Sequence, residues 1–187
     1  FQENVRVTVE MGNTDADTEI AKGILEYMED NGEVNAPEIC TFQKTRTRIT
    51  AYDYNDEAES LDLFYLIKSD TVLGKVNNNK VQQGFNYLMS FYREAMNGTL
   101  LRTVNIENTD EIAEVAKLVQ STKGSISQLR IYVITNGLTD PACVPSSVES
   151  SDDDFIIEYN VWDMKRVYRQ HNIRSGKEKV EIDFPIE

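Results

Sequence analysis

Two neighbouring stretches rich in β-branched and aromatic residues, 46–54 and 60–68, carry the strongest apolar pattern of the chain. The short acidic segment 55–59 joins them, and this arrangement predicts a β-hairpin. In the second stretch, apolar side chains fall on both faces: Leu61, Leu63, Tyr65 and Ile67 on one, Phe64 and Leu66 on the other. A strand that is apolar on both faces is typical of the centre of a covered sheet. We therefore expect the rest of the chain to supply cover on each side.

Apolar residues at helical spacing mark three further segments, and a glycine suited to a helix end follows each of them. The segments are 18–31, a stretch opened by Asn77, and one opened by the capping-box-like sequence 108–111; the glycines are Gly32, Gly98 and Gly124. A fourth helix is expected after Asn160, which can cap it. Trp162 would then lie in its first turn as a core anchor.

Other stretches have the character of strands. Residues 129–135 predict a second central strand, and weaker alternation predicts strands at 1–11, 155–159 and 179–184. Residues 100–106 indicate a short strand or an extended connection, and the polar stretch 136–154 a long loop. Helices that lead into apolar strands are typical of α/β domains. We predict one α/β domain over residues 1–187, a mixed sheet flanked by helices.

Composition narrows the functional classes. The chain has 187 residues, 40% of them hydrophobic, and a net charge of −13. Such a charge counts against a general nucleic-acid coat, because non-specific binding depends on Lys and Arg neutralising phosphates. It leaves room for nucleic-acid contact through two local basic patches: Lys44, Arg46 and Arg48, and Lys165, Arg166 and Arg169.

The cysteines and the hydropathy favour a cytoplasmic protein without membrane contact. Cys40 and Cys143 lie far apart without metal-ligand spacing, so two free thiols are favoured over one disulfide. No apolar run is long enough for a transmembrane helix, and the first residues do not resemble a signal peptide.

Several clusters of reactive residues have ordinary structural explanations. The acids Asp15, Asp17 and Glu19 lack the glycine and the final acid of an EF-hand loop and instead favour a helix start. Glu149 and the acidic run 152–154 suit a solvated loop. The single histidine, His171, follows a basic helix and has no evident catalytic partner. The chain contains no Gly-x-Ser-x-Gly turn, no Gly-x-Gly-x-x-Gly motif and no P-loop.

The hairpin carries the remaining candidate site. Asp53 and Asp62 lie on its adjacent strands, and Glu19 or Glu26 on the preceding helix could approach them. Metal-dependent nucleases place acids in this way to share Mg²⁺ or Mn²⁺, which binds the phosphate and activates water. We therefore name Asp53 and Asp62 as the candidate catalytic and metal-binding residues.

The usual companion lysine of such nucleases, two residues beyond the second acid, is missing. Phe64 occupies that position. Lys68 is on the same face as Asp62, but it lies about 20 Å further along the strand. The order α-β-β nevertheless resembles the start of a restriction-endonuclease-like domain.

Four stretches together resemble the N-terminal region of the bacterial abortive-infection phage-resistance (AIPR) family. They are residues 49–54, 61–64, 130–136 and 161–166. The resemblance implies the first domain of a longer phage-defence protein, with the remainder of its own polypeptide as a partner. It also implies a restriction-endonuclease-like fold. The family has Asp-Gly-Tyr on the first hairpin strand, whereas this chain has Thr50, Ala51 and Tyr52 there.

Three functions remain open. The first is a catalytically degenerate nuclease-like domain that acts in recognition or scaffolding in phage defence. The second is an active metal-dependent nuclease of the PD-(D/E)xK type that uses Asp53 and Asp62. The third is a protein-interaction domain unrelated to defence that uses the loop 136–154. The sequence does not indicate an oligomeric state.

Overall fold

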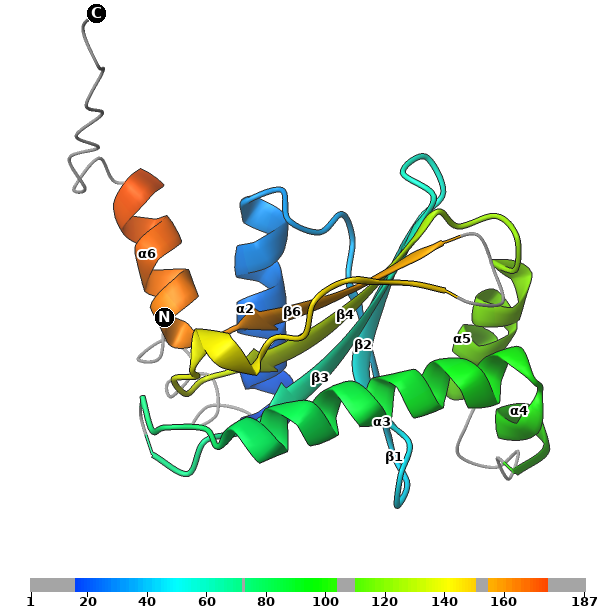
Figure 1. The fold of residues 1–187 in the computed structure, drawn as a ribbon, viewed down its shortest axis with the longest axis horizontal. Coiled ribbons are helices and arrows are strands. Elements are labelled where there is room, and N and C mark those ends of the chain that lie inside the picture. Colours follow the sequence, from blue (N-terminus) through cyan, green and yellow to red (C-terminus); the bar gives the residue numbers. More distant parts are fainter. Residues whose placement is uncertain (1–15, 72, 104–109, 151–154, 175–187) are drawn as a thin grey trace, which may run out of the picture.

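The computed structural model describes residues 16–71, 73–103, 110–150 and 155–174. Their strands form a single six-stranded mixed sheet: β1 (Glu38–Gln43), β2 (Arg48–Asn55), β3 (Ser60–Ile67), β4 (Gln128–Thr135), β5 (Val148–Glu149) and β6 (Ile156–Trp162). Helices cover both faces of it (Figure 1): α2 (Ala16–Asp30), α3 (Asn78–Met96), α4 (Thr99–Thr103), α5 (Asp110–Ser121) and α6 (Met164–Arg174). The predicted α/β class with a mixed sheet is confirmed.

The strand order is β1-β2-β3-β4-β6-β5. The first three strands are antiparallel neighbours, β3, β4 and β6 run parallel, and β5 pairs antiparallel with β6. The predicted hairpin is therefore β2–β3. Because β3 joins an antiparallel half to a parallel half, it lies inside the sheet, as its two-sided apolar pattern predicts.

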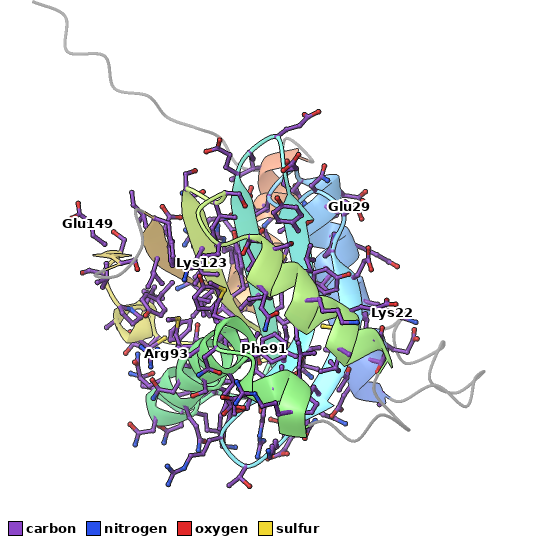
Figure 2. All side chains as sticks on the ribbon, turned by 90° about the vertical axis from the view of Figure 1, so that its right-hand side faces the viewer. Lys22, Glu29, Phe91, Arg93, Lys123 and Glu149 are labelled. Atoms are coloured by element: carbon purple, nitrogen blue, oxygen red, sulfur yellow. The ribbon has the colours of Figure 1, made fainter. Side chains whose placement is uncertain are left out.

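Two hydrophobic clusters lie on opposite faces of the sheet. Leu61 and Leu63 of β3 pack with residues of α3 and α5 in the first cluster. Phe64 and Leu66 pack with residues of α2 and α6 in the second. Figure 2 labels residues on both sides of the sheet: Phe91 of α3 is buried in the first cluster, whereas Lys22 and Glu29 are exposed on α2. The expectation that β3 is covered on both sides is confirmed.

Local signals place most helix ends correctly. The side chain of Asn77 accepts a hydrogen bond from the backbone N–H of Asn79 and caps α3. Gly98 follows that helix with φ of +71°, a conformation that glycine adopts without steric cost. Gly32 and Gly124 also have positive φ after α2 and α5, as their positions predict.

The expected helix at Asn160 is wrong in its start. Asn160 lies within β6, where it pairs with Tyr132 of β4, and the strand continues to Trp162. The helix begins after Asp163, whose Oδ1 accepts the backbone N–H of Arg166. Trp162 is fully buried, so its role as a core anchor is confirmed although it belongs to a strand. His171 lies within α6 and is exposed.

The expected strand or extended connection at 100–106 is also wrong for its described part. Asn97 Oδ1 accepts the backbone N–H of Thr99, and the chain turns into the short helix α4. Leu100 is fully buried there. The predicted strands at 1–11 and 179–184 lie outside the described residues.

Both cysteine thiols, Cys40 and Cys143, are free and buried. In the described part of the chain, no helix has both the length and the apolar character that crossing a membrane requires.

Candidate functional site

A row of charged residues crosses the sheet near the start of its parallel strands. The strand register aligns Asp53 of β2 with Asp62 of β3, Asp62 with Arg130 of β4, and Arg130 with Glu158 of β6. Asp62 and Arg130 each lie two residues before Phe64 and Tyr132, which pack on the α2 and α6 side, and side chains two residues apart on a strand share a face. The row therefore lies on that face of the sheet.

Arg130 binds both carboxylate oxygens of Asp62. Its Nε donates to Oδ1 and its Nη2 donates to Oδ2, each at 2.6 Å. The Asp62 side chain is only 1% exposed, and Nη1 of Arg130 also donates to the backbone oxygen of Glu33 at 3.3 Å. Two parallel charge-assisted hydrogen bonds make this a strongly oriented ion pair.

Asp53 lies beside this pair and is bound by backbone amides. Its Oδ2 accepts the N–H groups of Asn35 and Ala36 at 2.6 and 3.3 Å, from the loop that follows α2. Its Oδ1 is buried and has no hydrogen-bond partner in the described part of the chain. Asp53 thus ties the end of α2 to the hairpin.

Burial dominates the electrostatics of Asp62. It raises the pKa of this carboxyl to about 7, the neighbouring carboxylates of Asp53 and Glu158 add to the rise, and the guanidinium of Arg130 opposes it. Asp62 therefore depends on Arg130 as its charged partner in the core. Removal of Arg130 would leave an unpaired acid in the core.

The sheet row extends to α6 through Glu33. Arg166 of α6 donates to Glu33 Oε1 at 2.8 Å, and its guanidinium lies 4.5 Å from the centre of the Trp162 ring. Glu33 thereby contacts Arg130 with its backbone and Arg166 with its side chain. These contacts join the loop after α2, the sheet and α6.

The structure brings Asp53 and Asp62 together but adds no further acid of the predicted set. Glu19 pairs with Lys22, Glu26 is exposed, and Lys68 pairs with Asp17 of α2. Within residues 16–71, 73–103, 110–150 and 155–174, no group of three or more His, Cys, Asp and Glu side chains could hold a metal ion. A divalent ion at Asp62 would have to displace Arg130, so the donor set fits the guanidinium better. The metal site stays a prediction.

The sequence-based interpretation missed Arg130, the residue that decides the character of this site. A signal was present: Arg130 is a lone cation in the apolar stretch 129–135 that predicts a central strand. A buried cation requires a partner. The identity of that partner depends on the parallel register of β3 and β4, which is set by the tertiary structure.

Comparison with known proteins identifies the family. A family model described as "Abortive infection phage resistance protein N-terminal domain" matches residues 20–169. These residues contain all four stretches named above. A search of curated proteins and a search of solved structures give no match. The family match extends over most of the chain, from α2 to α6. The chain therefore belongs to the family of N-terminal domains of abortive infection phage resistance proteins.

Proposed function

We propose that this domain is a nuclease-like domain without catalytic activity, which serves a phage-defence protein in recognition or scaffolding. The observation that carries the proposal is the pair between Asp62 and Arg130. A nuclease acid must offer its oxygens to a metal ion, whereas both oxygens of Asp62 are bound by a guanidinium. Asp62 instead fixes Arg130 of β4 against β3, and Arg130 in turn binds the backbone of the loop at Glu33.

The two departures from the nuclease and family patterns support the same proposal. Thr50, at the position of the family's acid, is buried, and its Oγ1 accepts the backbone N–H of Leu66 at 3.0 Å. Phe64, at the position of the nuclease lysine, is fully buried and stacks on Tyr132 with ring centres 4.9 Å apart. Both positions contribute to packing of the sheet, and neither side chain is free for chemistry.

The two basic patches differ in their availability to a nucleic acid. Arg48 donates to the Tyr65 hydroxyl and lies over the Tyr87 ring, which leaves Lys44 and Arg46 exposed in the β1–β2 turn. Lys165 and Arg169 are exposed on α6. Recognition through these patches is part of the proposal, as is contact with the remainder of the polypeptide.

Cleavage assays test the loss of activity. The purified domain is incubated with single- and double-stranded DNA and with RNA, in the presence of Mg²⁺ or Mn²⁺. We expect no cleavage above the protein-free blank. While Arg130 binds both carboxylate oxygens of Asp62, that acid cannot hold a metal ion and its water. Product formation is followed on denaturing gels over several hours.

Matched variants separate real activity from contamination. Asp53→Ala removes a candidate ligand, and Asp56→Ala removes an exposed acid of the β2–β3 turn as a control. Divalent-dependent cleavage that Asp53→Ala abolishes and Asp56→Ala retains would overturn the proposal. It would establish the active-nuclease alternative instead.

A further inference from the structure

A cavity of about 200 Å³ lies at the carboxyl ends of the parallel strands β4 and β6. Its wall includes Thr139 from the loop after β4, Val161 from the end of β6, and three cations from the first turns of α6: Lys165, Arg166 and Arg169. Backbone contacts fix the loop to the helix, since Met164 donates its N–H to Gly137 O at 3.0 Å. The cavity is thus a built feature of the fold.

After β4 the chain first packs Leu138 against the cluster on the α2 side and then crosses to the α3 side of the sheet. After β4 it forms the 3₁₀ helix Pro141–Cys143, where Cys143 packs in the cluster on the α3 side and its backbone oxygen accepts a hydrogen bond from Gln82 of α3. After β6 it forms α6, where Val167 packs in the cluster on the α2 side. The cavity lies where the loop after β4 meets α6, beyond the carboxyl end of β6. In open α/β sheets, ligands bind outside the carboxyl ends of the strands.

The charge of the cavity is positive although the chain carries −13. Lys165 and Arg169 are exposed, and neither has an ion pair within residues 16–71, 73–103, 110–150 and 155–174. Arg166 is oriented by Glu33 at 2.8 Å and by the Trp162 ring. Two cations are therefore available to a ligand, and the third is held in position beside them.

One acid, Asp163, also lines the cavity, but its carboxylate is used internally. Its Oδ1 accepts the N–H of Arg166, and its Oδ2 accepts the N–H and the hydroxyl of Thr139 at 2.8 and 2.9 Å. These bonds cap α6 and hold the loop of Thr139 against the helix. Asp163 thus shapes the cavity and does not compete for the two available cations.

We propose, building on the recognition role proposed above, that this cavity binds a phosphate group, carried either by a nucleotide or by the backbone of a nucleic acid. Lys and Arg are the residues that bind phosphate through charge-assisted hydrogen bonds. The volume suits a phosphate with its adjoining sugar and is below the range typical of sites for drug-sized ligands. The site lies at the opposite ends of the parallel strands from the Asp62–Arg130 pair, and Glu33 links the two through Arg166.

Binding of defined phosphate compounds tests the proposal. The purified domain is titrated at low salt with inorganic phosphate, a 5′-mononucleotide and a short single-stranded oligonucleotide, without divalent ions. Shifts of the backbone amide NMR signals locate the bound ligand, and calorimetry measures its affinity. We expect saturable shifts at Thr139 and residues 163–169. Lys165→Glu with Arg169→Glu should weaken binding by about tenfold or more, since two charge-assisted contacts become repulsive.

A charge-matched control is available outside both basic patches. Lys117→Glu with Lys123→Glu changes the net charge equally at two exposed positions, one in α5 and one in the turn that follows it. We expect it to leave the affinity nearly unchanged, and Lys165→Gln with Arg169→Gln to weaken binding without charge reversal. Equal binding of the mononucleotide and the oligonucleotide identifies a nucleotide site, and selective binding of the oligonucleotide identifies a backbone site. Absence of saturable shifts at Thr139, or an equal loss of affinity in Lys165→Glu with Arg169→Glu and in the control pair Lys117→Glu with Lys123→Glu, would overturn the proposal.

Discussion

Replacement of Arg130 with methionine is expected to destabilise the domain by about 3–5 kcal/mol, because it leaves the Asp62 carboxylate buried and unpaired. Denaturant unfolding followed by circular dichroism measures the loss. Arg46→Met, at an exposed turn position, serves as the control and should change the free energy of unfolding by less than about 0.5 kcal/mol. The double variant Arg130→Met with Asp62→Leu should recover most of the loss, since apolar replacements remove both charges.

The loss at Arg130→Met is also expected to depend on pH. The pKa of Asp62 is already raised to about 7 by burial, and Arg130 opposes that rise, so its removal moves the pKa of the folded variant higher. A folded-state pKa above the unfolded one lowers stability as pH rises toward it. The two proteins therefore diverge above a pH of about 7, and the loss should be larger at about pH 9 than at about pH 6. A loss that shrinks as pH rises would contradict the burial of an unpaired carboxylate.

Replacement of Phe64 with lysine, the residue that a nuclease carries at this position, is expected to cost about 3–5 kcal/mol or more. Phe64 is fully buried on Tyr132, so the variant loses a packed ring and introduces an ammonium group into the core. Phe64→Leu keeps an apolar side chain and should cost considerably less. Thermal and denaturant unfolding of both variants measure the difference.

The outcome for Phe64→Lys bears directly on the proposed loss of catalysis. If the position is part of the core, the variant is destabilised and gains no cleavage activity, even in combination with Thr50→Asp. A stable Phe64→Lys variant that cleaves DNA or RNA with Mg²⁺ would show that the position belongs to a catalytic site.

Patterns that act over a few residues predict much of the fold. The hairpin β2–β3 follows from alternation and a short acidic link, and α3 follows from its apolar stripe between Asn77 and Gly98. The two-sided apolar character of β3 also predicts its central place. These features depend on local propensity and on which faces of an element are apolar, and the sequence displays both directly.

The errors occur where tertiary pairing overrides local signals. Asn160 has the residue type of a helix cap, yet β6 extends through it because β4 offers a parallel partner as far as Trp162. Asp163, three residues later, provides the cap instead. In the described part of 100–106, the chain turns at Gly98 into α4, where Leu100 is buried. Neither outcome can be predicted without knowing which elements pack beside these residues.

The candidate site was likewise predictable only in its local part. Adjacency of Asp53 and Asp62 follows from the hairpin register alone and is confirmed by their direct pairing. The partner of Asp62 lies in β4, far along the chain, and becomes its neighbour only through the parallel β3–β4 register. The cavity beside Lys165 and Arg169 likewise forms from the loop after β4, the end of β6 and the first turns of α6.

Manganese binding at the hairpin tests the central claim, that Asp62 binds a guanidinium and not a metal ion. The measurement is paramagnetic broadening of backbone amide signals during titration with Mn²⁺. The account predicts that broadening at Asp53 and Asp62 stays no greater than at the exposed Asp56, and that Asp62→Asn leaves it unchanged. Saturable broadening centred on Asp53 and Asp62, abolished by Asp62→Asn and retained in Asp56→Asn, would contradict it.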